Sequence, residues 1–94
     1  MSYSDVRYWK IAKEIEGERL RQEQLYREGF HAKTIQMCSQ LERLAILTEE
    51  IGEVAHEVCD GINRPLDKAH LREELKQCAA VCAAWIEALD KEQA

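Results

Sequence analysis

The chain has 94 residues, of which 46% are apolar and 33% charged, and its formal net charge is −5. This length and balance are typical of one small globular domain, residues 1–94, and they exclude an intrinsically disordered chain. No segment approaches the roughly 20 apolar residues of a membrane span, and residues 1–10 lack the apolar core of a signal peptide. We therefore expect a cytoplasmic protein with no membrane partner.

The negative charge is concentrated in one part of the chain. Residues 41–62 contain six acidic side chains and one basic side chain, so this segment carries −5 and the remainder is neutral on balance. A protein that binds duplex nucleic acid needs a basic face to neutralise phosphates. The charge distribution therefore argues against a nucleic-acid partner, and an anionic nucleotide would need a bridging metal ion.

The first predicted helix begins after Ser4, its expected N-cap, and runs to about Glu28, where Gly29 stops it. One proline and four glycines in the whole chain leave few turn signals for a β-rich fold, so we predict an all-α protein of three to four helices. Gly17 lies inside the first helix and costs up to about 1 kcal/mol relative to alanine. A bend or a break at Gly17 is therefore left open.

The second predicted helix has the clearest apolar periodicity in the chain and ends at Asp60 and Gly61, before a turn that contains Pro65. Its acidic residues lie largely on the side opposite the apolar one, which is the pattern of an amphipathic helix. The apolar and small positions, at steps of three and four residues, are Leu41, Leu44, Ala45, Thr48, Ile51, Gly52, Ala55, Val58, Cys59 and Ile62.

The third predicted helix follows Asp67, a favourable N-cap residue, and is apolar on more than one face. Alanines flank a seven-residue repeat that is suited to helix-on-helix packing. The repeat consists of Leu71, Leu75, Cys78, Cys82, Trp85 and Leu89. Three helices are too few to cover two faces of one of them, so we expect a homodimer or a dimer of dimers that completes the bundle.

Three glutamates of the second helix form a candidate metal site. At about 100° per residue, Glu49, Glu50 and Glu53 share roughly a quarter to a third of the helix circumference. Like charges this close destabilise a helix by a few tenths of a kcal/mol per pair, a cost that a bound cation would reverse. Mg²⁺ and Mn²⁺ prefer such oxygen ligands, although solvated glutamates on a surface helix are commoner.

The motif Glu49-Glu50-x-x-Glu53, followed on the next helix by Glu74-x-x-Gln77, resembles the signature of the MazG-like, all-α nucleoside triphosphate pyrophosphohydrolases. The flanking segments 44–48 and 75–89 and the opening run 18–24 are also similar to this family. The resemblance covers most of the chain. It implies a helical bundle completed by oligomerisation, and hydrolysis of a (deoxy)nucleoside triphosphate to the monophosphate and pyrophosphate.

The resemblance also assigns roles to residues. It implies Mg²⁺ or Mn²⁺ held by Glu49, Glu50, Glu53 and Glu74, with Gln77 as a fifth ligand where the family usually has aspartate, and with Glu50 and Glu53 as the catalytic carboxylates. Nucleotide-pool cleaning is a role consistent with this activity. Basic residues near the predicted loops are the candidates to hold the triphosphate: Lys33, Arg64, Lys68 and Arg72.

The glutamine at position 77 leaves a second interpretation open. A neutral amide oxygen can keep the ligand geometry but removes one negative charge, and Glu73 is close enough to substitute in part. The chain is then a catalytically weak or inactive member that acts as a nucleotide-binding, oligomerisation or regulatory module. A small antitoxin-like helical bundle also fits the helices but leaves the acidic motif unexplained.

Several other side chains have a structural and a functional interpretation. His56 is either solvent-facing or in contact with substrate, and His70 is either an ordinary first-turn residue or a group that orients Glu74. Trp9 and Trp85 either pack on other helices or stack on a base. The cysteines are interpreted as small buried thiols, with a zinc site at two of them as the alternative; they are Cys38, Cys59, Cys78 and Cys82.

Overall fold

The computed structural model describes residues 3–27 and 34–93 of the chain. Within these ranges it contains α1 (Tyr3–Arg27), a short 3₁₀ turn η1 (Ile35–Met37), α2 (Gln40–Asp60) and α3 (Lys68–Gln93), and no strand. The prediction of an all-α fold is confirmed for these ranges, where three α-helices are found of the three to four expected.

The ends of α2 and α3 follow from local side-chain chemistry. Ser39 caps α2 through a capping box, in which Glu42 N donates to Ser39 Oγ at 3.1 Å and Ser39 N donates to the Glu42 carboxylate at 2.9 Å. Gly61 follows the last turn of α2, and its N–H donates to Val58 O at 3.1 Å. Asp67 caps α3, as predicted, because its Oδ1 accepts from His70 N at 3.0 Å.

The first helix differs slightly from its predicted bounds. It begins at Tyr3, so Ser4 lies within the helix and is not its N-cap, and it continues through Gly17 without a break. The predicted stop at Gly29 lies outside the described residues. Outside the backbone of α1 itself, no atom of the described residues lies within 4 Å of a Cβ built on Gly17, so steric crowding does not explain the glycine at this position.

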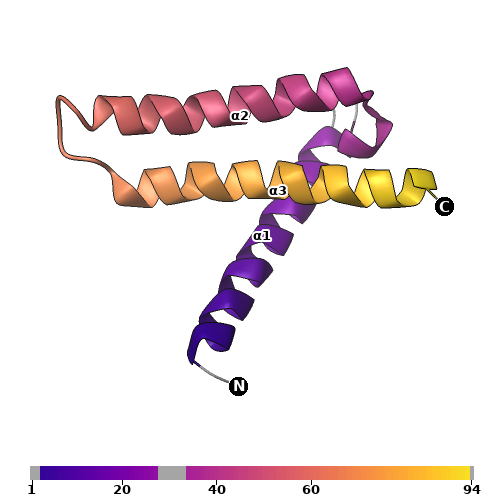
Figure 1. Cartoon of the computed structure of the whole chain (residues 1–94), viewed down its shortest axis with the longest axis horizontal. Coiled ribbons are helices and arrows are strands. Elements are labelled where there is room, and N and C mark those ends of the chain that lie inside the picture. Colours follow the sequence, from indigo (N-terminus) through magenta and orange to yellow (C-terminus); the bar gives the residue numbers. More distant parts are fainter. Residues whose placement is uncertain (1–2, 28–33, 94) are drawn as a thin grey trace.

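The third helix is the centre of the molecule. α2 and α3 form an antiparallel hairpin, while α1 crosses α3 steeply and its N-terminal half extends away from the hairpin (Figure 1). The crossing is fixed by ion pairs between α1 and α3, including those of Arg72 with Glu14 and of Arg19 with Glu87. The two halves of the proposed acidic motif lie on α2 and α3, which pack directly against each other.

The core of the hairpin is small and partly polar. Ile35, Val81 and Ala84 form its buried centre, and Ile46, Leu47 and Trp85 pack against it. Arg43 is also buried, with only 1% of its surface exposed. Its guanidinium donates to Ile35 O at 2.9 Å, Gln36 O at 3.3 Å, Gln40 Oε1 at 3.1 Å and Glu92 Oε1 at 2.9 Å. This one side chain ties η1 and the C-terminal end of α3 to the start of α2.

The periodic apolar face of α2 does not face α3. The residues of α2 that turn toward α3 include the buried Arg43 and Glu57, whereas Leu44, Ile51 and Val58 are 51%, 53% and 52% exposed. An amphipathic helix ordinarily buries its apolar side in its own domain. In the single chain α2 does the opposite, because its apolar side is exposed. We call this exposed face the outer stripe, and its residues are Leu41, Leu44, Ala45, Thr48, Ile51, Gly52, Ala55, Val58 and Cys59.

The predicted packing repeat of α3 is buried only in part by the single chain, because Leu71, Cys78, Trp85 and Leu89 are partly buried. Leu75 is 50% exposed and Cys82 is exposed, while the buried residues on this helix are Glu74, Ala80, Val81, Ala84 and Ala88. The alanines allow α1 and α2 to approach α3 closely on both sides, which leaves the larger side chains outside.

None of the helices in the described ranges is long and apolar enough to cross a membrane.

Candidate functional site

The acidic motif gathers along the interface between α2 and α3. Glu50 is partly buried, and burial is the main cause that raises its pKa above the ordinary value. The carboxylates of Glu74, Glu49, Glu53 and Glu18 raise the pKa of Glu50 further, in that order. The carboxylates predicted to act together on α2 and α3 thus interact electrostatically, with Glu50 at the centre.

Glu74 is the most enclosed carboxylate among the predicted ligands. It is 8% exposed, and its Oε1 lies 3.4 Å from Nε2 of His70, one turn earlier on α3. Its Oε2 is buried and has no hydrogen-bond partner within residues 3–27 and 34–93. A buried carboxylate oxygen without a partner costs about 1–3 kcal/mol or more. An oxygen-preferring divalent cation is a chemically suitable partner for this atom.

His70 links Glu74 to a second buried carboxylate. Its Nδ1 lies 2.6 Å from Oε1 of Glu57, which is on α2 and 8% exposed. The imidazole therefore has a carboxylate at each ring nitrogen, one from each helix of the hairpin. This geometry favours the interpretation of His70 as a group that orients Glu74. The other histidine, His56, is exposed, and its Nε2 lies 3.3 Å from Asp60 Oδ2.

The first helix adds a carboxylate that sequence reasoning missed. Glu18 is 6% exposed and accepts two hydrogen bonds from Arg21, at 2.8 and 2.7 Å, and one from Gln22 at 3.1 Å. Burial raises the pKa of Glu18, but these hydrogen bonds and the charge of Arg21 outweigh it and lower the pKa below its usual value. Gln22 also donates to the backbone carbonyl of Gln77 at 3.3 Å, which fixes α1 against the second half of the motif.

Two basic residues lie beside this acidic group. The hydrogen bond to Glu18 raises the pKa of Arg21, and the charges of Glu73 and Glu50 raise it further, although the Arg21 side chain is 53% exposed. Lys76 Nζ lies 3.0 Å from Glu73 Oε1, and its charge acts on Glu18 as well. The only signal for Arg21 in the sequence was the resemblance of the run 18–24 to the family.

The basic residues predicted from the sequence are less well placed. Arg72 forms a bidentate pair with Glu14 of α1, at 2.9 and 2.7 Å, and Arg64 pairs with Asp60 at 2.9 Å. Lys68 is exposed in the first turn of α3. Lys33 lies outside the described residues. The structure therefore brings Arg21 and Lys76 to the acidic group and leaves Arg64 and Arg72 engaged with other carboxylates.

The side chains of the acidic motif do not form a complete set of metal ligands. Within residues 3–27 and 34–93, no three His, Cys, Asp or Glu side chains are arranged so that they could hold a metal ion. Glu49 and Glu53 are exposed, and Gln77 is partly buried. Like-charged carboxylates repel one another, so side chains that converge on a cation are expected to separate in its absence. The fit to a metal therefore rests on the orphaned Glu74 oxygen and on the charge around Glu50.

The cysteines depart from the expectation of uniformly buried thiols. Cys38 is buried, but Cys59 and Cys82 are exposed. Cys78 is partly buried. Burial raises the pKa of its thiol, and the charges of Glu50, Cys82 and Glu74 raise it further. The described residues provide no metal-holding cluster that includes Cys78 and Cys82.

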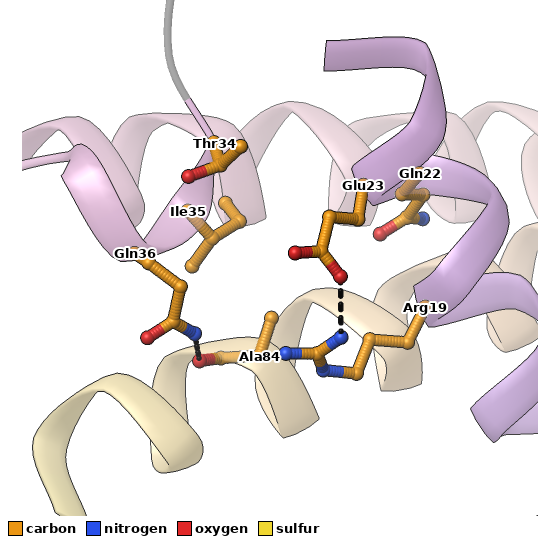
Figure 2. Close-up of a pocket in the computed structure, with 7 residues that line it drawn as sticks. All are labelled: Arg19, Gln22, Glu23, Thr34, Ile35, Gln36 and Ala84. Carbon is orange, nitrogen blue, oxygen red and sulfur yellow. Dashed lines mark hydrogen bonds and ion pairs between the residues drawn. The ribbon is translucent and has the colours of Figure 1, made fainter. Parts of the chain in front are cut away.

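Two cavities lie between α1 and other parts of the described chain. A small pocket of about 20 Å³ lies between α1, η1 and α3, where Arg19 pairs with Glu23 and Gln36 donates to Ala84 O at 2.9 Å (Figure 2). It has room for about one water molecule. A larger, mostly apolar cavity of about 300 Å³ lies between α1 and α3, near the lower end of the sizes of ligand pockets. Its lining residues are Ile11, Glu14, Ile15, Arg72, Leu75, Lys76 and Ala79.

The two tryptophans occupy different environments. Trp85 packs against the core, and its Nε1 donates to Gln40 Oε1 at 2.7 Å. Trp9 is 54% exposed on α1, with Lys13 Nζ 5.7 Å from its ring centroid.

Comparison of the chain with family models, curated proteins and solved structures finds no match.

Proposed function

We propose that the chain is a metal-dependent nucleoside triphosphate pyrophosphohydrolase of the MazG-like type, which cleaves a (deoxy)nucleoside triphosphate to the monophosphate and pyrophosphate. The observation that carries the proposal is the buried Glu74 Oε2 of α3, which has no hydrogen-bond partner among the described residues, and Glu74 also raises the pKa of Glu50 on α2 through its charge. Elevated carboxylate pKa values produced by burial and like charge are typical of functional sites. We include in the proposal a cytoplasmic role in nucleotide-pool cleaning, which is consistent with this activity.

The proposed ligands of Mg²⁺ or Mn²⁺ are Glu49, Glu50, Glu53 and Glu74, with Gln77 as a neutral fifth donor. The bound ion would supply charge neutralisation on the phosphates and a more acidic water. Glu50 and Glu53 are the candidates to accept the proton of the attacking water. Because the pKa of Glu50 is raised, its carboxylate is a stronger base than an ordinary glutamate.

The remaining residues of the site bind and orient. Arg21 pairs with Glu18 and Lys76 pairs with Glu73, and these two cations are the candidates to hold the triphosphate chain. His70 and Glu57 position Glu74 through the contacts at each nitrogen of the imidazole. Contacts of this kind from a neighbouring side chain hold a metal ligand in one orientation.

Homo-oligomerisation, as a dimer or a dimer of dimers, is part of the proposal. Large apolar side chains are more than half exposed on all three helices, among them Trp9, Ile51 and Ile86. Contiguous apolar surface on a small protein is a mark of an interaction site.

A second candidate function is a nucleotide-binding or regulatory module without turnover. Two observations favour it, namely the neutral Gln77 in the second half of the motif and the open arrangement of the carboxylates. A module of this kind would keep nucleotide affinity and release no pyrophosphate.

One assay separates the two candidates. The purified chain is incubated with a panel of ribo- and deoxyribonucleoside triphosphates and Mg²⁺, and pyrophosphate is measured. E53A tests the site, and E16A is the matched control because Glu16 is an exposed glutamate of α1. We expect release by the wild type and E16A and none by E53A. Nucleotide binding without release from any substrate would support the module instead.

A further inference from the structure

The larger cavity, between α1 and α3, has an aliphatic wall. Its apolar lining consists of Ile11 and Ile15 of α1 and of Leu75 and Ala79 of α3. The two helices diverge from their crossing (Figure 1), and the side chain of Ala79 is too small to fill the space between them. Ile11 and Leu75 are 42% and 50% exposed. An occupant of the cavity would therefore remove apolar surface of the described chain from water.

The polar side chains that line this cavity are all charged. Arg72 and Lys76 lie on α3, and Glu14 lies on α1. Hydrogen bonding to Arg72 lowers the pKa of Glu14, although burial opposes this effect. The charges of Arg72, Lys10 and Lys76 lower that pKa further. With Glu73, which pairs with Lys76 at 3.0 Å, the group has three cations and two carboxylates, an excess of one positive charge in a chain of net charge −5.

These features select the chemistry of a ligand. The uncharged part of the lining is aliphatic and has no side-chain hydrogen-bond donor or acceptor. The edge of a nucleobase buried against it would leave polar atoms without partners, which weakens binding. A hydrocarbon body has no such atoms. An anionic head complements the excess positive charge, and a carboxylate matches the forked donors of the Arg72 guanidinium.

The existing ion pairs leave the cations within reach of a ligand. The Arg72 side chain is 52% exposed, and that of its partner Glu14 is 31% exposed. Because exposed ion pairs contribute little to stability, exchange of Glu14 for the carboxylate of a ligand is feasible. Lys76 is 20% exposed, and its partner Glu73 is half exposed and lies outside the lining.

We propose that the cavity between α1 and α3 binds a small organic anion, with a hydrocarbon body against Ile15, Leu75 and Ala79 and a carboxylate at Arg72 and Lys76. The proposal goes beyond the pyrophosphohydrolase activity and stands without it. Lys76 is shared with the candidates for triphosphate binding, whereas the aliphatic wall belongs to the cavity alone.

A series of ligands with one body and different head groups tests the class of ligand. Phenylbutyrate, phenylbutanol and phenylbutylammonium are titrated calorimetrically into the wild-type chain, without nucleotide or divalent metal. We expect the anion to bind about tenfold more tightly than the alcohol, and the cation to bind most weakly. No binding of the anion, equal affinities of anion and alcohol, or displacement of phenylbutyrate by an uncharged nucleoside would overturn the proposal.

Variants test the location of the site. A79F fills the cavity, and A69F is the matched control because Ala69 is an exposed alanine of the same helix. We expect A79F to abolish phenylbutyrate binding and A69F to retain it, both with unchanged circular dichroism. E14Q removes the carboxylate that competes for Arg72, so it should tighten binding severalfold, whereas E16Q, at an exposed position of α1, should not.

The E14Q comparison does not rely on the folding of A79F. Unchanged binding of phenylbutyrate by a folded A79F, or an E14Q variant that binds no more tightly than E16Q, would overturn the proposal.

Discussion

His70 Nδ1 lies 2.6 Å from Oε1 of Glu57, across the interface between α3 and α2. The contact brings a histidine from the first turn of one helix to a buried carboxylate of the other. The second nitrogen of the same imidazole lies 3.4 Å from Glu74, so the ring contacts both Glu57 of α2 and the proposed metal ligand. The position of Glu74 therefore depends on residues that the motif itself does not include.

Replacing His70 should weaken divalent-metal binding more than it changes the fold. H70A removes the group that orients Glu74, and loss of such a supporting contact typically costs about 10–100-fold in metal affinity. H56A is the matched control, since His56 is exposed and pairs only with Asp60 among the contacts described above. Calorimetric titration with Mn²⁺ measures the affinity, with helicity as the check on folding. Equal Mn²⁺ affinities in H70A and H56A would contradict the positioning role.

Neutralising Glu50 should stabilise the metal-free protein at neutral pH. Burial and four neighbouring carboxylates raise the pKa of Glu50 in the folded state, so its ionised form opposes folding once the pH exceeds that pKa. E50Q removes this penalty, which we place at roughly 0.5–1 kcal/mol from like-charge terms of a few tenths each. Urea unfolding in the presence of a chelator measures it, with E16Q as control.

The gain from E50Q should depend on pH in one direction. It is expected at pH 7, should shrink as the pH falls through the folded pKa of Glu50, and should vanish well below the unfolded value of about 4.3, where both states hold the proton. A metal-free E50Q protein that is less stable than the wild type at pH 7 would show that the carboxylates around Glu50 do not repel it.

Replacing Gln77 by the aspartate that the MazG-like signature has at this place should strengthen the proposed site. Q77D adds a negative charge at a partly buried position of α3 whose backbone carbonyl is already fixed by Gln22. We expect tighter Mg²⁺ binding without a loss of pyrophosphohydrolase activity. Parallel measurements of Mg²⁺ affinity and of turnover check both parts. A drop in turnover would mean that the activity of this site requires Gln77.

Arg43 should be the most sensitive basic residue for stability. R43K keeps the charge but loses most of the hydrogen bonds that hold Ile35, Gln36 and Glu92 to α2. We expect the free energy of unfolding to fall by about 2–4 kcal/mol. R64K, at an exposed ion pair, should change it by less than about 0.5 kcal/mol. Urea unfolding of the two variants side by side provides the comparison, and similar stabilities would contradict the structural role of Arg43.

The helices could be predicted from the sequence because their signals are local. The periodicity of α2, the stop at Gly61 and the cap at Asp67 all act within one or two turns, and the structure has them as predicted. Which face of α2 turns inward was not predictable from the same pattern. An apolar stripe indicates burial against something, but the pattern does not distinguish α3 from a surface outside the chain.

The candidate site shows the same division between local and long-range information. Glu49, Glu50 and Glu53 share one helix, so their proximity follows from helical spacing alone. The approach of Glu18 and Arg21 depends on the angle at which α1 crosses α3, and no local signal encodes it. The burial of Arg43 and Glu57 was equally unforeseen, because charged residues are rarely buried unless paired.

The most direct measurement of the central claim is the identity of the products formed by the site. Phosphorus NMR of a nucleoside triphosphate incubated with Mg²⁺ and the wild-type chain should show monophosphate and pyrophosphate in equal amounts, and no products with E74Q. Diphosphate with free phosphate, or equal turnover by the wild type and E74Q, would contradict the assignment of Glu74 and its neighbours to α–β phosphate cleavage.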